Sequence, residues 1–189
     1  MGEGGNKGDL LTGLKVEPAP ITKGVGLADL IDSSLLAYNG GRLREACRLF
    51  SGPMLDENTT VGLSISGALT PAGLGVSAII PLIKAGFVDW IVTTGANLYH
   101  DLHFAMGLPF HQGRPDGDDV TLHQSGVVRI YDLLIDFDHL LKTDAFCRRV
   151  TAAEEFAGLM SSAEFHFRFG RYAAQRERVL GHGESVSLL

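Results

Sequence analysis

The sequence predicts an α/β fold built on a parallel sheet, because two strand–turn–helix units follow one another in residues 61–106. In the first unit, Val61, Leu63 and Ile65 alternate with small or polar residues, which is the period-2 pattern of a strand. In the second unit, residues 90–92 form a short apolar strand. Parallel sheets of this kind bind ligands at the carboxyl ends of their strands. A ligand site is therefore expected at the two turns that follow these strands.

Both turns are rich in small residues, which let backbone N–H groups approach a ligand closely. The first turn is residues 66–73, Ser-Gly-Ala-Leu-Thr-Pro-Ala-Gly, and the second is residues 93–97, Thr-Thr-Gly-Ala-Asn. Neither matches the glycine pattern of a dinucleotide-binding loop or of a P-loop. Many strand–helix turns use glycine for packing alone, so the pattern leaves a ligand role and a packing role equally open.

A helix is expected after each turn. The first is predicted over residues 76–83 and ends at Gly86, a C-cap glycine. The second carries Leu98, Leu102, Ala105 and Met106.

The segment before the first strand predicts an arm and two helices. Residues 1–25 are rich in glycine, proline and charge and show no period, which is typical of a flexible N-terminal arm. An amphipathic helix is predicted over residues 27–38, ended by Asn39-Gly40-Gly41. A second, shorter helix is predicted over residues 43–50. These two helices extend the α/β unit at its N-terminus.

Beyond the second unit, residues 108–124 predict a long loop with at most a short strand or helical turn, and long loops are often functional. Residues 126–130 predict a third strand, which residues 133–135 either continue or follow as a separate extended piece. Asp136 and Asp138 come next and suggest either a cation site or, for Asp138, a helix N-cap.

The C-terminal part predicts helices. Thr151-x-x-Glu154 and Ser161-x-x-Glu164 fit capping boxes, and a long helix follows the second of them, ending near Gly181. Residues 185–189 have no clear structural role and are interpreted as a tail. The long helix contains three closely spaced phenylalanines, Phe165, Phe167 and Phe169, whose spacing does not fit a single helical face. Two of the three are expected in the core.

Composition excludes several classes of protein. The formal net charge of −6, with no basic stripe, argues against a nucleic-acid partner. No apolar run reaches the roughly 18 residues that span a bilayer, and the N-terminus lacks a signal-peptide pattern, so no membrane partner is expected. Cys47 and Cys147 belong to no Cys-x-x-Cys pair, which favours buried thiols and a cytoplasmic location.

The second helix begins with several polar side chains. His100 and His103 share a helix face and could ligate one metal ion, but no third ligand follows at a diagnostic spacing, so no metal is expected. A polar helix start facing a substrate cleft is the preferred interpretation. Asp101 would then accept hydrogen bonds from a sugar hydroxyl or a cationic amine, or serve as a first-turn carboxylate favoured by the helix dipole.

Two blocks resemble one known family. Residues 88–95, Val-Asp-Trp-Ile-Val-Thr-Thr-Gly, followed by Asp101-Leu102, are similar to a signature of deoxyhypusine synthase. Residues 122–134 are similar to a second segment of that family. The order and spacing agree, and the resemblance covers residues 27–184, closest to the bacterial deoxyhypusine synthase-like branch.

The resemblance implies a Rossmann-like, three-layer fold with a mostly parallel sheet, of which residues 26–184 would be an incomplete, N-terminal part of the NAD-binding domain. It also implies an alkyl-group transferase that uses NAD to oxidise spermidine or a related polyamine, and passes an aminobutyl group through a lysine imine to an acceptor amine. By position, the NAD contacts fall on Gly67, Ala68, Leu69, Thr70, Pro71, Thr94, Gly95, Ala96, His100 and Asp101. The polyamine contacts fall on Tyr99 and His100.

The chain departs from the family pattern in three places. Gly67-Ala68 replaces Ser-Asn, Ala96-Asn97 replaces Gly-Gly, and Tyr99-His100 replaces a pair of glutamates. None of the five lysines lies in the context of the family's catalytic lysine: Lys7, Lys15, Lys23, Lys84 and Lys142. The catalytic residues therefore stay unassigned, and the isolated chain is expected to be inactive.

The sequence leaves three functions open. The first is the N-terminal half of an NAD-dependent aminobutyl transferase, which works as a homo-oligomer or with a complementary chain. The second is a non-catalytic truncated paralogue that serves as a scaffold or regulatory subunit. The third is a small α/β domain that binds another nucleotide.

Overall fold

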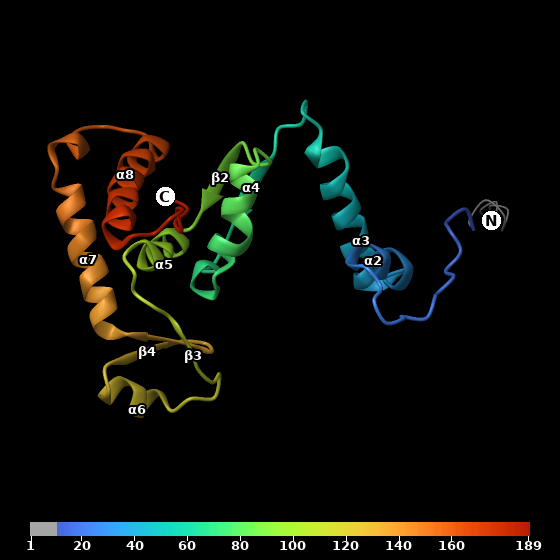
Figure 1. The fold of residues 1–189 in the computed structure, drawn as a ribbon, viewed down its shortest axis with the longest axis horizontal. Coiled ribbons are helices and arrows are strands. Elements are labelled where there is room, and N and C mark those ends of the chain that lie inside the picture. The colour runs from blue at the N-terminus through green and yellow to red at the C-terminus, as the bar shows by residue number, and fades with distance from the viewer. Residues whose placement is uncertain (1–10) are drawn as a thin grey trace, which may run out of the picture. The chain divides into compact units, whose positions relative to one another are not determined.

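A computed structural model describes residues 11–189 and divides the chain into two compact units, with the boundary between Thr60 and Val61. The boundary lies inside the domain expected at residues 26–184. Most of the arm expected at residues 1–25 can be compared with the structure: residues 11–25 form no helix or strand, and residues 1–10 lie outside the described residues. Figure 1 labels helices and strands of the two units.

The first unit contains helices α2 (Leu27–Ser34) and α3 (Tyr38–Ser51) and the short 3-10 helix η1 (Pro53–Leu55). Two helices were expected, but their boundary was wrong: residues 38–41 begin α3 instead of ending α2. Leu35 leaves the helical conformation, and Gly41 N–H donates to the Ala37 carbonyl (2.8 Å), which opens the new helix three residues later. Arg48 holds the two helices together by pairing with Asp32 (2.8 Å).

The second unit begins with the parallel pair that the sequence predicts. Strand β1 (Gly62–Ile65) pairs with β2 (Trp90–Thr93) in a register that places Gly62 opposite Trp90. Between them lie the 3-10 helix η2 (Thr70–Ala72), a π-helical turn η3 (Gly75–Ile79) and α4 (Ile80–Lys84). The expected helix is present but changes its hydrogen-bond pattern, because Pro81 has no N–H to donate to the preceding turn. Gly86 follows α4 with φ +77°, as a helix-ending glycine requires.

The prediction of a mostly parallel sheet is wrong for the described residues, although the α/β class is confirmed. The predicted third strand is β4 (Val127–Ile130), and it joins a separate sheet with β5 (Leu133–Asp136) and β3 (His111–Gln112), in the order β3-β5-β4. All pairs in this second sheet are antiparallel. Only two residues connect β4 to β5, and the first of them, Tyr131, has φ +56°. A parallel crossover needs a far longer connection, so this short turn forces a hairpin.

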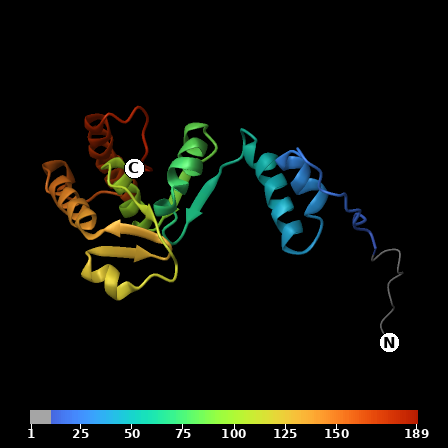
Figure 2. The same ribbon diagram turned by 60° about the horizontal axis from the view of Figure 1, so that its bottom comes forward.

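Three helices build the hydrophobic core of the second unit: α5 (Gly95–Ala105), α7 (Phe137–Thr151) and α8 (Ser162–Leu180). They contact one another pairwise, and the two views show them packed beside the strands (Figures 1 and 2). The buried apolar side chains of this core are Leu102, Ala105, Met106, Val150, Phe169 and Ala173. No helix among residues 11–189 is long and apolar enough to cross a membrane.

The predicted loop 108–124 does contain a short strand, β3, and a short helix, α6 (Asp119–Gln124). Helix α7 is capped by Asp136, which accepts from Asp138 N–H (2.8 Å), so the N-cap expected at Asp138 was two residues late. The sequence also suggested a cation site for this acidic pair, but the Asp136 carboxylate is used as the helix cap.

One predicted capping box is wrong, and the other is half formed. Thr151 ends α7, and its hydroxyl donates to the Cys147 carbonyl (2.9 Å), so it caps nothing in the 3-10 helix η4 (Glu154–Phe156). Ser161 caps α8 as predicted by accepting from Glu164 N–H (3.1 Å). The Glu164 carboxylate pairs with Arg168 and leaves the box open.

The residues predicted as a tail, 185–189, pack against α5 and α8. Leu189 contacts the hydrophobic core, and its carbonyl lies so close to Gly170 that a Cβ there would sit 1.9 Å from it. The prediction of two core phenylalanines is confirmed, because Phe169 is buried, Phe165 packs against the core, and Phe167 is 66% exposed. Both cysteines are free and half-buried.

Candidate functional site

The two turns meet at the carboxyl ends of β1 and β2, as the parallel pairing predicts. We call residues 66–71 and 94–97 together the two-loop edge. The Thr94 hydroxyl joins the turns by donating to the Gly67 carbonyl (2.5 Å), and it also accepts from Asn97 N–H (3.4 Å) as the N-cap of α5. One hydroxyl thus fixes the first turn and begins the helix of the second.

Asn97 is the structural centre of the two-loop edge. Its side chain is fully buried, and its Oδ1 accepts from Leu69 N–H (2.7 Å) while its Nδ2 donates to Thr93 Oγ1 (3.1 Å). Its carbonyl accepts from the hydroxyl of the buried Thr70 (2.7 Å). Sequence reasoning placed Asn97 in the turn but gave it no role. The available signal was an amide side chain two residues into a helix, where it can reach back to neighbouring backbone groups.

The outer rim of the two-loop edge consists of exposed small residues. Gly67 and Ala68 from the first turn and Gly95 and Ala96 from the second are all exposed. Gly67 adopts φ +67°, and a Cβ placed on Gly67 or Gly95 would have no neighbour within 4 Å. The space over these backbones is therefore open, and Gly95 and Ala96 are the first residues of α5, an end that attracts anions.

Of the predicted residues, Leu69, Thr70 and Pro71 form the inner side of the edge, where Thr70 and Pro71 are buried and Leu69 is half-buried. They support the loop rather than lie on its surface.

Tyr99, a predicted polyamine contact, is turned toward α7. Its hydroxyl donates to Asp144 Oδ1 (2.9 Å) and lies 3.2 Å from the Leu140 carbonyl. Burial and the hydrogen bond to the Asp144 carboxylate raise the pKa of Tyr99 far above its usual range. Its ring also lines a cavity of about 230 Å³ together with Gly95 of the two-loop edge and His166 of α8.

His100 and His103 stack on one another, with ring centroids 5.5 Å apart, and both contact the ring of Phe110. His103 is fully buried, its Nδ1 lies 3.0 Å from the Tyr99 carbonyl, and burial lowers its pKa to about 4. Burial also lowers the pKa of His100. The pair is therefore neutral at pH 7, and no group of three or more potential metal ligands occurs among residues 11–189.

Asp101 faces neither a cleft nor the first turn of its helix. It is completely buried, and its Oδ2 accepts from the Ser187 hydroxyl and from Leu188 N–H, both at 2.6 Å. Its Oδ1 finds no hydrogen-bond partner within the described part of the chain. Burial raises the pKa of Asp101 to about 6. The expectation of a carboxylate open to ligand is therefore corrected: in this structure Asp101 anchors residues 187 and 188, a role that the tail interpretation had hidden.

A cavity of about 270 Å³ adjoins the edge between β2, α5 and α8. Its lining includes Ile91 and Thr93 of β2, Leu98 of α5 and His166 of α8. Together with the cavity beside Tyr99, it gives the two-loop edge an apolar flank that sequence reasoning missed, because its walls come from segments seventy residues apart.

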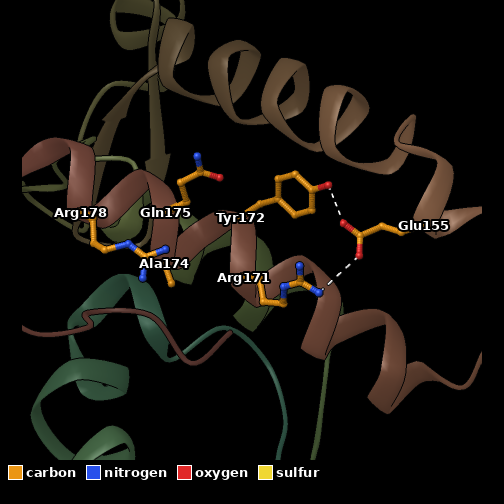
Figure 3. A pocket seen from close by; sticks show the side chains of 6 residues that line it. All are labelled: Glu155, Arg171, Tyr172, Ala174, Gln175 and Arg178. Carbon is orange, nitrogen blue, oxygen red and sulfur yellow. Dashed lines mark hydrogen bonds and ion pairs between the residues drawn. The ribbon is translucent and has the colours of Figure 1, made fainter.

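A further pocket of about 330 Å³ lies on α8 away from the edge, and Figure 3 shows its polar side chains. Glu155 accepts a hydrogen bond from the Tyr172 hydroxyl (2.6 Å) and pairs with Arg171 (3.6 Å). Glu155 therefore neutralises Arg171 within this pocket, while Arg178 on its lining has no ion pair among residues 11–189.

Comparison with known proteins supports the resemblance. Residues 29–185 match the family model described as deoxyhypusine synthase. The chain is 50% identical over 176 residues to a deoxyhypusine synthase-like protein of Nostoc punctiforme, covering 93% of this chain and 45% of that protein. It is 49% identical over 173 residues to a protein of the same description from Thermosynechococcus vestitus, covering 92% and 43%. A probable deoxyhypusine synthase of Methanosarcina acetivorans is 34% identical over 138 residues, covering 72% and 43%. The chain thus spans somewhat less than half the length of these curated relatives.

Proposed function

This chain belongs to the deoxyhypusine synthase family, and we propose that it supplies the NAD-contacting loops of a transferase that moves an aminobutyl group from spermidine or a related polyamine. The observation that carries the proposal is the two-loop edge. It offers exposed backbone without side-chain cover at the carboxyl ends of two adjacent parallel strands, beside the N-terminus of α5.

The residues of the edge fit a dinucleotide by their chemistry. Gly95 and Ala96 begin α5, so their N–H groups have no carbonyl of a preceding helical turn to bond and are suited to a phosphate group. Gly67 and Ala68 allow the first turn to approach the same ligand, because neither carries a large side chain. Bound NAD would supply a hydride acceptor for the carbon next to the polyamine nitrogen.

The flanking cavities fit the aliphatic part of a polyamine. The cavity beside Tyr99 is lined mainly by apolar side chains, and it adjoins Gly95 at the edge. We propose that this cavity excludes water from the methylene chain, and that Tyr99 and His100 remain the polyamine contacts on this chain. Because His100 is neutral, it can accept a hydrogen bond from an ammonium group but cannot pair with it as a carboxylate would.

The nucleophile of the transfer is proposed to lie outside these 189 residues. Among the described lysines, Lys84 pairs with Glu184 (2.9 Å), Lys142 is on α7, and Lys15 and Lys23 precede the first helix. None of the four belongs to the two-loop edge. The chain alone is therefore expected to bind NAD without turning over spermidine, and to need either a homo-oligomer or a complementary chain for catalysis.

The test is calorimetric titration of the chain with NAD, using Ala96→Glu as the disruptive variant. Glutamate in the first turn of a helix does not destabilise it, but its charge repels a phosphate. The matched control is Ser162→Glu, which puts the same charge into the first turn of α8. We expect NAD binding in the wild type and the control and at least about tenfold weaker binding in Ala96→Glu. Equal affinity in all three proteins, or no binding in any, would contradict the proposal.

A spermidine-dependent rise in NADH absorbance separates the remaining alternatives. NADH formation by the isolated chain would show that the catalytic group is present and would refute its expected inactivity. NAD binding without turnover, followed by rescue on adding a lysine-bearing partner, supports a shared active site. A scaffold or regulatory subunit is favoured instead if no partner restores turnover. That outcome would agree with the burial of Asp101 beneath residues 187 and 188, because a buried carboxylate does not face a ligand.

A further inference from the structure

A groove lies at the opposite end of α5 from the two-loop edge. It encloses about 360 Å³ between the end of α5, one side of α7 and one side of α8. We call it the cationic groove. Its main lining residues are Met106, Leu108, Lys142, Phe146, Arg149 and Arg176.

The rim of the cationic groove carries three positive charges and no negative one. Lys142 and Arg149 come from α7, and Arg176 comes from α8. No acidic residue lines the groove, and none of the three cations has an ion pair within residues 11–189. Arg176 is half-buried as a residue, and no carboxylate pairs with it in the described part of the chain.

The floor of the cationic groove is apolar and is part of, or packed against, the hydrophobic core. Met106 is 9% exposed and belongs to the buried core, while Leu108 and Phe146 pack against that core. Met106 is held further by the Thr143 hydroxyl, 3.7 Å from its sulfur. The floor is therefore formed by packed core residues, over which an apolar ligand body could lie.

The pocket shown in Figure 3 provides the contrast on the same helix. There Arg171 already has the Glu155 carboxylate, so an incoming anion would have to displace a built-in partner. The cationic groove contains no such partner. Arginine donors arranged around an apolar floor are suited to an anion with a hydrophobic body.

From this arrangement we propose that the cationic groove is a second binding site, for a small organic anion that has an apolar body and a carboxylate or phosphate group. Its volume is at the lower end of the range for small-molecule sites, about 300 to 1,000 Å³. Helix α5 begins in the two-loop edge and ends at the groove, and its eleven residues span roughly 15 Å along the helix axis. The proposal therefore does not depend on the chain binding NAD.

Methyl NMR of the full chain labelled at methionine tests the proposal directly. The sequence has four methionines, and Met106 is the one that lines the groove, so its resonance reports on occupancy. The probes are octanoate, octyl phosphate and the uncharged 1-octanol. The disruptive variant is Arg149→Gln/Arg176→Gln, and the matched control is Arg171→Gln/Arg178→Gln, which removes two arginines from the pocket shown in Figure 3.

We expect one or both anions to shift the Met106 methyl resonance saturably, with 1-octanol at least about tenfold weaker. The Arg149/Arg176 variant should lose this affinity by a similar factor, and the Arg171/Arg178 control should keep it. A preference for octanoate would identify a carboxylate ligand, and a preference for octyl phosphate a phosphate ligand. The proposal fails if 1-octanol binds as well as the anions, if neither anion shifts Met106, or if both double variants behave alike. It also fails if Met106 shifts with protein concentration alone, because that outcome would assign the groove to a second copy of the chain.

Discussion

Helix α5 combines two regions with opposite properties. Its first two residues, Gly95 and Ala96, are exposed and have open space above them, whereas Asn97, Asp101 and His103 are completely buried. All of these residues lie within nine positions of the sequence. This block, which resembles a family signature, therefore contains two kinds of residue: exposed residues that can contact a ligand, and buried residues that hold the ligand-facing backbone in place.

The buried region of α5 is polar, and two of its side chains bond to other segments of the chain. Asn97 connects the helix to the first turn, and Asp101 connects it to residues 187 and 188. Unpaired polar groups in such surroundings are costly, so the buried side chains are expected to control stability. The exposed region makes few contacts and is expected to control affinity instead.

The largest effect is expected from Asn97→Ala. The substitution removes a fully buried side chain and leaves Leu69 N–H and Thr93 Oγ1, both half-buried, without the partner that Asn97 provides; each such loss costs about 1–3 kcal/mol. The free energy of unfolding should fall by about 3 kcal/mol in urea titrations. Asn58→Ala, an exposed asparagine in the other unit, is the control and should change the free energy by less than about 0.5 kcal/mol. Equal effects of the two substitutions would show that Asn97 does not hold the edge together.

The next effect concerns pH, because Asp101 and His103 titrate in opposite senses. The pKa of Asp101 is raised from 3.8 to about 6, so the folded state binds the proton more tightly and this group adds stability as pH falls from 6 toward 4. The pKa of His103 is lowered from 6.5 to about 4, so the unfolded state binds the proton more tightly and this group removes stability over the same fall. In the wild type the two contributions oppose each other.

Single substitutions should therefore separate the two slopes. Asp101→Asn should lose stability on acidification more steeply than the wild type, by on the order of 2 kcal/mol between pH 6.5 and 4. His103→Gln should lose stability less steeply than the wild type or gain it. Urea midpoints measured at several pH values decide the matter. Parallel curves for the three proteins would mean that neither group is coupled to folding.

A smaller effect is expected from Gly170→Ala. A Cβ at this position would lie 1.9 Å from the backbone oxygen of Leu189 and 2.7 Å from its carbonyl carbon, so the segment that carries Leu189 cannot keep its place. Residues 187–189 should shift, and the hydrogen bond from Leu188 N–H to Asp101 should weaken. We expect faster hydrogen exchange at Leu188 and a loss of about 1–2 kcal/mol in stability. Unchanged protection of Leu188 would show that Gly170 is not required for the docking of this segment.

The outcome of the sequence predictions follows the same division between local and distant contacts. The β1–β2 pair and the Gly181 end of α8 follow from patterns along the sequence, and both were placed correctly, whereas α5 begins at Gly95, inside the turn predicted over residues 93–97. The antiparallel sheet was missed because apolar spacing gives no strand direction, although the two-residue Tyr131-Asp132 turn decides it.

In the candidate site, local pattern located the exposed rim but could not reveal partners from distant segments. The carboxylate of Asp101 meets Ser187, eighty-six residues later, and Tyr99 meets Asp144 on α7. A residue's spacing along one helix assigns it to a face, but it does not say which element covers that face. The burial of Asp101 and the direction of Tyr99 therefore had to come from the structure.

The smallest effect is expected from Thr94→Val, which acts where the two regions of α5 meet. Valine keeps the shape of threonine but removes the hydroxyl that caps α5 and donates to the Gly67 carbonyl. Loss of an N-cap costs about 1 kcal/mol, and the Gly67 carbonyl is exposed and can bond to water instead. Stability should therefore fall only slightly, while the first turn becomes free to move relative to Gly95 and Ala96. If the two-loop edge binds NAD, its affinity should fall several-fold in calorimetry although every backbone group on the rim is still present. Thr94→Ser, which keeps the hydroxyl, should retain wild-type affinity. A serine variant as weak as the valine variant would show that the methyl group of Thr94, and not the bond between the turns, organises the edge.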